Sequence, residues 1–491
     1  MTDVCLILEG TYPFVSGGVS TWIHQLVSAM SELRFSILYI SPFPNPRREY
    51  KYKVPSNVVE IQDLYLHEYA FAKGRSWPWR RRRVFKTIMD IQKRIGEEDW
   101  GALAEALPYL RDKGVALTDW DFFDSQEAWE ALAEVYSSSG GHVSFLDYFW
   151  TWRSMHLSLF KTLRAPIPKA RLYHTVSTGY AGVLASVAKA TQDRAMLLTE
   201  HGVYTHERLL EISQATWIYT PHHERFRVQK DLSFFKKLWL NFFHSMGCIT
   251  YHHADRILTL YEGNKTKQIL SGAPPHKISI IPNGIDLDHF RGLYDSRPTE
   301  DRPPAVAFIG RVVSIKDVKT FLYAAKLVLA QLPKTEFLIL GPTDEEPEYY
   351  QECRELVGNL GIQGAVKFLG KVDMKDHYQR LDLVVLTSLS EAQPYVILEA
   401  NAAGIPVVAT DVGACREMLE GRLPEDRRIG PSGLLTGVAN PEETAAAVLR
   451  LLRDDLLRTA MSESGRNRTL RFYDLNDLVS QYLNLYEQMM R

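Results

Sequence analysis

Two loops in the second half of this 491-residue sequence carry charged side chains at spacings that suit phosphate chemistry. The first loop, Gly310-Arg311-Val312-Val313-Ser314-Ile315-Lys316-Asp317, follows the apolar run 305–309 and precedes a helical pattern. With Gly310 at the end of a strand, Arg311 and Lys316 can clamp a diphosphate and stabilise a departing phosphate. The alternative, two solvated bases in a surface loop, stays open from this segment alone.

The second loop is Glu391-Ala-Gln-Pro-Tyr-Val-Ile-Leu-Glu399, which lies between the apolar run 383–387 and a helical pattern. We expect the helix to begin near Pro394, because a proline in the first turn lacks only an N–H that would be unpaired there. The N–H groups of Tyr395 and Val396 would then be available to bind a phosphate.

Two acidic residues, Glu391 and Glu399, flank this expected helix start. Glu399 lies about one turn inside the helix, within reach of a ribose diol, and Glu391 can accept hydrogen bonds from sugar hydroxyls. Helix capping and dipole complementarity explain one acidic residue near a helix start. They do not explain this spacing together with the basic loop upstream, so the two loops favour ligand binding.

The first half offers two weaker signals at expected strand ends. Gly17 and Gly18, followed by Val19-Ser20, precede a helical pattern, where adjacent glycines let the backbone approach a ligand. This pair lacks the spacing of a dinucleotide fold or a P-loop. His201, in Thr199-Glu200-His201-Gly202, ends another strand. Turns explain most such glycine pairs, and a structural role for His201 remains as good an interpretation as a functional one.

Both sets of loops require strands that end on one side of a sheet. Short apolar runs that predict strands lie at 4–8, 35–40, 170–176, 195–199, 256–260 and 278–281, and then at 305–309, 337–340, 366–369, 383–387 and 407–410. Helical patterns separate them, which predicts parallel pairing and two doubly wound α/β sheets. Residues 295–304 have the composition of a linker. Ligands of such sheets bind at the carboxyl ends of the strands.

The alternation of strands and helices breaks within an insertion at about 73–160, which we expect to be helical. Residues 69–89 hold seven basic side chains and no acidic one, and residues 97–134 hold eleven acidic side chains against two basic ones. The basic, Trp-bearing stretch 73–86 has three interpretations: a solvated face, a patch for anionic lipid, or a docking site for a membrane partner.

The composition excludes several classes of protein. A net charge of −2 gives no global basic character for nucleic acid. Four scattered cysteines suit a reducing compartment and disfavour disulfides or structural zinc. With neither a signal peptide nor a membrane-spanning run evident, we expect a cytoplasmic protein. All ten Trp lie at or before Trp239 and fourteen of fifteen His precede Arg291, so the halves differ in make-up.

The motifs together resemble the family 4 glycosyltransferases. Five elements occur in the order seen in that family, namely Gly17–Ser20, His201, Ile281-Pro282-Asn283-Gly284-Ile285-Asp286, the Arg311/Lys316 loop and the Glu391–Glu399 motif. The resemblance is strongest over 278–452. Within the family, Glu9-Gly10-Thr11-Tyr12-Pro13, Thr199–Gly202 and the long insertion resemble the Pel-type exopolysaccharide glycosyltransferases. Ala392 and Pro394 stand where many relatives have glycines.

This resemblance implies a GT-B fold, with two Rossmann-like domains facing each other across a cleft. The first domain would span 1–290 plus 472–491, because the terminal helix crosses back in such folds, and the second would span 291–471. The resemblance also implies roles for single residues. Arg311 and Lys316 would neutralise the leaving diphosphate without a metal, Glu399 would hold the ribose, Glu391 would bind donor-sugar hydroxyls, His201 would lie near the transferred sugar and Gly18 near the phosphates.

The expected function is a metal-independent, retaining transfer of a hexose or N-acetylhexosamine from a UDP-sugar to a growing exopolysaccharide. The expected partners are the UDP-sugar, a saccharide acceptor and a membrane protein of an export complex that binds 73–86, which would place the chain at the inner face of the membrane. Two D-x-D strings, Asp119-Trp120-Asp121 and Asp286-Leu287-Asp288, are not interpreted as metal ligands. Two alternatives remain: a non-catalytic GT-B scaffold for a membrane assembly, and a phosphorylase with a different cofactor.

Overall fold

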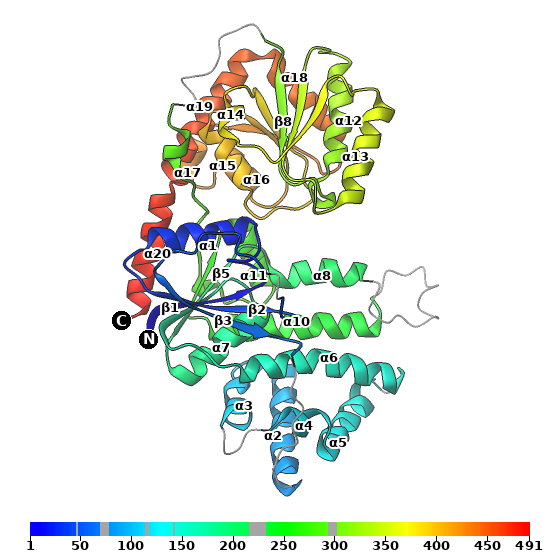
Figure 1. Cartoon of the computed structure of the whole chain (residues 1–491), viewed down its shortest axis with the longest axis vertical. Helices are drawn as coiled ribbons and strands as arrows, with labels where there is room; N and C mark the ends of the chain where they lie inside the picture. The colour runs from blue at the N-terminus through cyan, green and yellow to red at the C-terminus, as the bar shows by residue number, and fades with distance from the viewer. Residues whose placement is uncertain (46–47, 69–77, 113–116, 141–142, 216–231, 293–301) are drawn as a thin grey trace. The chain divides into compact units, whose positions relative to one another are not determined.

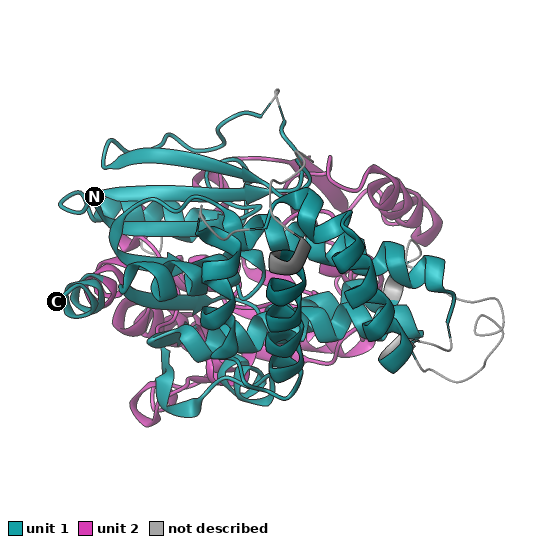
Figure 2. Ribbon diagram, turned by 90° about the horizontal axis from the view of Figure 1, so that it is seen from below, with its two compact units in different colours: residues 1–259, 264–280, 483–491 teal, residues 260–263, 281–482 magenta. Residues whose placement is uncertain are grey.

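The structure, a computed structural model, describes residues 1–45, 48–68, 78–112, 117–140, 143–215, 232–292 and 302–491. The chain forms two compact units (Figure 2). Unit 1 comprises residues 1–259, 264–280 and 483–491, and unit 2 comprises residues 260–263 and 281–482. Most of the linker expected at 295–304 lies outside the described residues.

Unit 1 is built on one parallel sheet. Among the described residues it has seven strands in the order β3-β2-β1-β4-β5-β6-β7, and every neighbouring pair is parallel. The strands are β1 (Thr2–Glu9), β2 (Phe35–Ser41), β3 (Val58–Tyr65), β4 (Ala170–Thr175), β5 (Ala195–Glu200), β6 (Arg256–Thr259) and β7 (Ile278–Ile280). The six predicted strands of the first half are therefore present, and β3 is an additional edge strand.

Helices cover both faces of the unit 1 sheet (Figure 1). The helix α1 (Gly18–Ala29) lies on one face, and α7 (Tyr180–Gln192) and α10 (Phe234–His253) lie on the other. The helix α8 (Tyr204–Gln214) packs on α10, and α11 (Glu262–Leu270) follows β6. The apolar run at the start of α10 packs into this core, as a buried helix would.

The insertion is helical over its described residues. It contains α2 (Pro78–Gly96), α3 (Ala102–Arg111), α4 (Asp119–Phe123), α5 (Gln126–Val135), the π-helical turn η1 (Tyr136–Gly140) and α6 (Phe145–Arg164). These helices pack outside α7 and α10 (Figure 1), and their apolar faces join the same core as the sheet. The insertion therefore extends unit 1.

The segregated charge of the insertion is partly paired within it. Arg81 of α2 contacts Glu127 at 3.0 Å and the buried Asp121 at 3.6 Å, and Arg82 lies 3.4 Å from Glu130. Residues 73–77 of the basic stretch lie outside the described residues. The described basic helix therefore directs part of its charge at the acidic segment that follows it.

Unit 2 repeats the architecture with a second parallel sheet. Among the described residues its strands take the order β10-β9-β8-β11-β12-β13. They are β8 (Ala305–Ile309), β9 (Glu336–Leu340), β10 (Val366–Gly370), β11 (Leu383–Leu386), β12 (Val407–Thr410) and β13 (Gly433–Thr436). Five match the predicted strands, and β13 is additional.

Two apolar cores sandwich the unit 2 sheet. One lies under α12 (Val318–Leu329), α13 (Pro347–Leu360) and α18 (Pro441–Arg453). The other lies under α14 (Lys375–Tyr378), α15 (Tyr395–Ala402) and α16 (Cys415–Glu420). The helix α17 (Pro424–Arg427) precedes β13, and α19 (Asp455–Phe472) and α20 (Leu475–Met489) close the chain. All four cysteines are buried and free, as their scattered positions predict.

The division between the units differs from the expected boundaries at 290 and 472. The N–H of Ile285 donates to the carbonyl of Tyr473 at 2.9 Å, and the N–H of Leu475 donates back to Ile285 at 3.0 Å. Ile285 also packs in a unit 2 core. This pairing holds residues 281–290 and the start of α20 in unit 2, and only the end of α20 belongs to unit 1.

Candidate functional site

The candidate ligand site of unit 2 lies where its sheet changes direction. The chain runs from β8 to β9 on one side, whereas β11 lies on the other side of β8, so the topological switch falls between β8 and β11. Open parallel sheets bind ligands at such a switch, outside the carboxyl ends of the strands. The loops that follow β8 and β11 are the two that the sequence indicated.

The β8 loop is anchored to the end of β11 through its main chain. Its 3-10 turn η4 (Ser314–Lys316) leads to Asp317, whose backbone adopts φ +46° and whose side chain caps α12 by accepting from the N–H of Thr320 at 3.2 Å. The hydroxyl of Thr387 donates to the carbonyls of Lys316 and Asp317 at 3.2 and 2.8 Å. The position of Lys316 is therefore fixed relative to the β11 loop.

Lys316 and Glu391 meet directly. The Lys316 ammonium donates to Oε1 of Glu391, and the hydroxyl of Ser388 donates to the same oxygen at 2.6 Å. The lysine and glutamate side chains are only 19% and 10% exposed. Their mutual attraction is thus little screened by water, and an incoming phosphate oxygen would compete with Glu391 for the ammonium group.

Arg311 has a different partner. Its guanidinium donates to both carboxylate oxygens of Glu345 at 2.5 and 2.6 Å, in the loop after β9, and both side chains are about half exposed. These two loops approach closely at Gly341 (φ +147°), where a Cβ would lie 2.0 Å from the carbonyl oxygen of Gly310. The structure therefore directs the two predicted clamp residues, Arg311 and Lys316, to carboxylates of different loops.

The helix α15 begins next to the Lys316–Glu391 pair. Pro394 is its N-cap, one position earlier than a first-turn proline, and Tyr395 and Val396 are its first two residues. Among the described residues no side chain caps this helix, and its first turn contains no acidic residue. Its N-terminus therefore keeps the partial positive charge that attracts anions.

Glu399 lies one turn inside α15 and has a neighbour that the sequence did not indicate. The hydroxyl of Tyr378, from α14, donates to its carboxylate at 2.9 Å. Burial raises the pKa of Glu399 above its usual value. Tyr378 is itself buried, so it orients a carboxylate that can accept hydrogen bonds from a diol. Its only sequence signal was its place in a short helical pattern.

Gln393 is a second residue without a predicted role. Its side-chain oxygen accepts from the N–H of Asn283 at 2.6 Å, and both residues are buried. Asn283 belongs to Ile281–Asp286, which the sequence indicated only as part of the family pattern. The bond fixes this segment against the loop that carries Glu391.

Unit 1 has a cavity of about 370 Å³ at the carboxyl edge of its sheet. Its walls come from the ends of five strands and from α1 and α8, namely Glu9, Gly10, Thr11, Val19, Ile40, Ser41, Pro42, Leu66, Val176, Ser177, His201, Gly202, Tyr204, Glu207 and Arg208. Gly17 caps α1 and Gly18 is its first residue, with open space where side chains would be. The helix α1 lines the cavity with Val19 instead.

His201 lies in the wall of this cavity as a neutral base. Burial lowers its pKa to about 4, and its ring packs edge-on against Trp22 with centroids 4.7 Å apart. Its Nε2 atom is buried and has no hydrogen-bond partner among the described residues. A neutral imidazole with a free nitrogen can exchange a hydrogen bond with a hydroxyl group.

Glu200, the residue before His201, joins several elements of unit 1 through its carboxylate group. The carboxylate of Glu200 accepts from Tyr251 at 2.7 Å, from Gln268 at 2.8 Å, and from Thr178 and the N–H of Tyr204 at 3.1 Å. Burial raises its pKa. These bonds fix the end of β5 and therefore the position of the next residue.

Two further carboxyl groups line the cavity and were not among the predicted site residues. Burial raises the pKa of both Glu9 and Glu207. Glu9 also accepts from the N–H of Ala181 at 3.4 Å. Glu9 opens the motif Glu9–Pro13, so a signal existed for it, whereas Glu207 stands in an ordinary helical pattern.

The aspartates of both D-x-D strings have partners in the structure. Asp121 forms a capping box with Thr118, and Asp119 pairs with Arg164 at 2.6 Å. Asp286 caps the short helix η3 (Leu287–Phe290). Within the described part of the chain, no three His, Cys, Asp or Glu side chains gather as a metal-ligand set.

A helix that spans a membrane must be long and apolar. Within the residues that the structure places, no helix combines the length and apolar character that spanning a membrane requires.

Comparison with known families divides the chain in two. Residues 2–276 match a family described as a domain of unknown function (DUF3492). Residues 303–454 match a family described as glycosyl transferases group 1. This second segment contains all the predicted site residues of unit 2.

Curated relatives and solved structures add further similarities. The chain is 29% identical over 249 residues to D-inositol 3-phosphate glycosyltransferase of Corynebacterium urealyticum, which is 48% of this chain and 57% of that protein. It is 34% identical over 214 residues to phosphatidyl-myo-inositol mannosyltransferase of Mycolicibacterium smegmatis, which is 42% of this chain and 51% of that protein. The chain thus matches only about half the length of these relatives.

A structural similarity extends over the whole chain. The Anabaena protein Alr3699/HepE, solved in complex with UDP, matches 99% of this chain and 100% of its own length with a TM-score of 0.61 at 13% identity. A match of this kind shows a shared fold. Together with the two parallel sheets, it confirms the expected fold class of two Rossmann-like domains with a helical insertion in the first.

Proposed function

The chain belongs to the DUF3492 family, whose description names no activity, and we propose that it is a glycosyltransferase that uses a UDP-sugar as donor. The observation that carries this proposal is the Lys316–Glu391 pair at the topological switch of the unit 2 sheet. A cation, a carboxylate and a helix N-terminus lie together at the position where such sheets bind ligands.

The residues of this site supply complementary parts of donor recognition. Lys316 and the N–H groups at the start of α15 suit the diphosphate, and Arg311 reaches it by leaving Glu345. Glu399, oriented by Tyr378, suits the ribose diol. Glu391 then exchanges its bond with Lys316 for hydroxyl groups of the donor sugar. Gly310 lets the β8 loop turn toward the crevice.

The similarity to known proteins supports this assignment. The segment 303–454 that matches glycosyl transferases group 1 contains Arg311, Lys316, Glu391 and Glu399. The two curated relatives are named as a glycosyltransferase and a mannosyltransferase, and the Anabaena structure holds UDP. These names indicate sugar transfer as the class of reaction and UDP as the nucleotide to test first.

The proposed reaction breaks the bond between the donor sugar and its diphosphate and retains the configuration of the sugar, without a metal ion. Charge develops on the leaving diphosphate as this bond breaks. Two cationic side chains held at that point, Lys316 and Arg311, give the electrophilic assistance that a metal ion gives in other enzymes.

The proposed acceptor is a growing exopolysaccharide of the Pel type, to which a hexose or N-acetylhexosamine is added. Unit 1 contributes a cavity of about 370 Å³ in which the neutral His201 and polar side chains can bind sugar hydroxyls, and Gly17 and Gly18 leave open space at the start of α1. The chain would work in the cytoplasm at the inner face of the membrane, where stretch 73–86 docks on a membrane protein of the export complex.

A nucleotide titration of the full-length protein tests the proposal. In buffer with EDTA, we expect UDP to bind at least tenfold more tightly than ADP or GDP by calorimetry, and a UDP-hexose to be turned over. Lys316→Ala should weaken UDP binding at least tenfold and lower turnover by two to three orders of magnitude. The matched control is Lys319→Ala, a nearby exposed lysine that pairs with Glu352, and should leave both unchanged.

Three outcomes would contradict the proposal. They are absence of UDP binding, loss of turnover on chelation, and normal turnover in Lys316→Ala. If changes in stretch 73–86 abolish function in cells while Glu391→Gln does not, the chain is a non-catalytic scaffold. An absorbance scan for a bound pyridoxal chromophore tests the phosphorylase alternative.

A further inference from the structure

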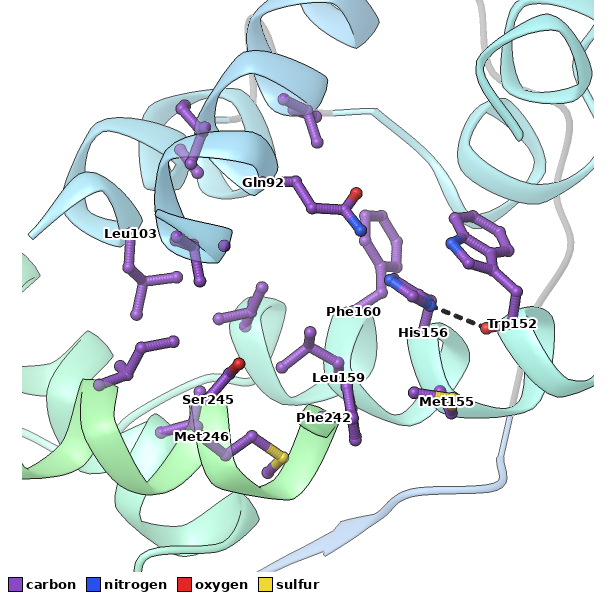
Figure 3. Close-up of a pocket in the computed structure, with 18 of the residues that line it drawn as sticks. Gln92, Leu103, Trp152, Met155, His156, Leu159, Phe160, Phe242, Ser245 and Met246 are labelled. Atoms are coloured by element: carbon purple, nitrogen blue, oxygen red, sulfur yellow. Dashed lines mark hydrogen bonds between the residues drawn. The ribbon is translucent and has the colours of Figure 1, made fainter. Parts of the chain in front are cut away.

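A second cavity of unit 1 lies among the helices of the insertion, apart from the carboxyl edge of the sheet. It measures about 380 Å³ and is lined by residues of the six helices α2 to α7 and of α10, none of which lines the carboxyl-edge cavity (Figure 3). The cavity is partly open to solvent, and its volume falls within the range of small-molecule sites.

The lining of this insertion cavity is almost entirely apolar. Of its 24 described lining residues, the polar ones are Gln92, His156, Asn241 and Ser245, together with the Tyr148 hydroxyl and the Trp152 indole N–H, and none is Asp, Glu, Lys or Arg. Leu103, Leu159 and Phe242 are typical of the rest. Water is held poorly by such walls, because a buried water molecule needs two to four polar partners.

Three polar groups lie on one side of the cavity, whereas Ser245 lies on α10, away from them (Figure 3). Figure 3 shows the amide of Gln92, the imidazole of His156 and the indole of Trp152 near one another. His156 Nδ1 is engaged with the carbonyl of Trp152 at 2.8 Å. Among the described residues, the Gln92 amide has no hydrogen-bond partner, and neither has the buried Nε1–H of Trp152. This side, the Gln92 end of the cavity, can therefore bind a polar atom of a ligand.

The cavity contains no charge that would balance an ionic ligand. Burial lowers the pKa of His156 to about 4, so the imidazole is neutral near pH 7. A carboxylate, phosphate or ammonium group bound here would lose its hydration without gaining a counter-charge. A peptide segment would bring backbone N–H and C=O groups that the walls cannot satisfy. A neutral hydrocarbon with one polar atom has neither cost.

We propose that the insertion cavity binds the hydrocarbon chain of a neutral amphiphile and that the Gln92 end hydrogen-bonds a hydroxyl or ester oxygen of this ligand. The acyl chain of a membrane lipid and an isoprenoid alcohol are two sources of this chemistry. The proposal rests on the cavity alone and holds whether or not unit 2 binds a UDP-sugar.

Three soluble probes test the proposal on delipidated full-length protein. We expect saturable one-to-one binding of 1-dodecanol or farnesol by calorimetry, with dodecanoate at least tenfold weaker because its charge is unpaired in the cavity. Tighter binding of dodecanol assigns an acyl chain, and tighter binding of farnesol assigns an isoprenoid. Failure of both alcohols to bind, or equal binding of dodecanoate, would overturn the proposal.

Two variants locate the binding. Leu159→Trp fills the cavity and should weaken alcohol binding at least tenfold, whereas Leu456→Trp, the same change at an exposed site in unit 2, should leave it unchanged. Trp152→Phe keeps an aromatic ring but removes the indole N–H, so it should weaken binding a few-fold even if Leu159→Trp fails to fold. Circular dichroism verifies folding. Unchanged binding in both cavity variants would overturn the site.

Discussion

The carboxyl edges of the two sheets differ in how they handle charge. In unit 1 burial disfavours charge on the edge groups: the pKa of His201 falls to about 4, and the pKa values of Glu9 and Glu207 rise. In unit 2 the edge carries cations, Lys316 and Arg311, each paired with a carboxylate from another loop. A neutral edge suits hydroxyl groups, whereas an ion pair can be exchanged for a phosphate oxygen.

The same contrast holds in the interiors. Unit 1 buries the carboxyl group of Glu200 among four neutral hydrogen-bond donors. Unit 2 buries a full ion pair, Arg468–Asp426, at 2.6 Å, and the guanidinium also donates to two backbone carbonyls at 2.7 Å. Because every Trp of the sequence lies in unit 1, Trp fluorescence monitors that unit separately. The contrast can therefore be tested one unit at a time.

The largest effect is expected from Arg468→Met. Removing the guanidinium leaves the carboxylate of Asp426 buried and unpaired, which costs about 3–5 kcal/mol. In urea unfolding, the circular dichroism transition should shift to lower urea while the Trp fluorescence transition of unit 1 stays in place. Arg471→Met, an exposed change on the same helix, is the control. A shift of both transitions together would show that the two units unfold as one.

The sequence predicted those features of the two units that depend on local patterns. The sequence located the buried strands, which have continuous apolar runs, and therefore also the positions of the loops that follow them. The edge strand β3 was missed because its acidic residues interrupt the apolar alternation, and β13 because it holds just two apolar residues, Leu434 and Leu435. The helix α19 was missed because it has no continuous apolar face.

The contacts between residues of different loops could not be predicted from the sequence. The meeting of Lys316 with Glu391 depends on β8 lying beside β11, and strand order is not encoded in any one segment. The same holds for Arg311. The sequence predicted that it acts with Lys316 as a diphosphate clamp, whereas in the structure it pairs with Glu345. The neutral state of His201 depends on burial by Trp22, which is far away in the sequence.

The second prediction tests the neutrality of the unit 1 edge through His201→Gln. A histidine whose folded pKa is about 4, below its ordinary 6.5, takes up its proton more readily when unfolded, so the folded state loses stability as pH falls from 6.5 to 4. Relative to the glutamine variant, wild type should lose about 3 kcal/mol between pH 7 and pH 4. Trp fluorescence during urea unfolding at each pH measures this difference.

The control is His276→Gln, an exposed change in unit 1. If His201→Gln and His276→Gln show the same dependence of stability on pH, the pKa of His201 does not differ between the folded and unfolded states.

A smaller effect is expected from Tyr378→Phe. The change removes one hydrogen bond to the carboxylate of Glu399 without emptying the site, which corresponds to about 1 kcal/mol, or about fivefold in the Kd for UDP. Calorimetry measures the affinity, and Tyr350→Phe, whose ring packs on Phe368, is the matched loss of a hydroxyl in the same unit. Equal affinities in the two variants would remove Tyr378 from the proposed ribose site.

The smallest effect is expected from Glu345→Gln, and it tests whether exposed and buried ion pairs of unit 2 differ as argued. The Arg311–Glu345 pair is about half exposed, so solvent screens it and its loss should change stability by less than about 1 kcal/mol.

If Arg311 leaves this pair to bind phosphate, removing the competing carboxylate should tighten UDP binding about twofold to fivefold. Calorimetry at low and high salt measures the gain, which should shrink as salt screens the charges. Glu355→Gln, an exposed change at a carboxylate that accepts a hydrogen bond from Gln351, is the control. An unchanged or weaker affinity in Glu345→Gln would mean that Arg311 serves unit 2 as a loop tether and leaves the diphosphate to Lys316.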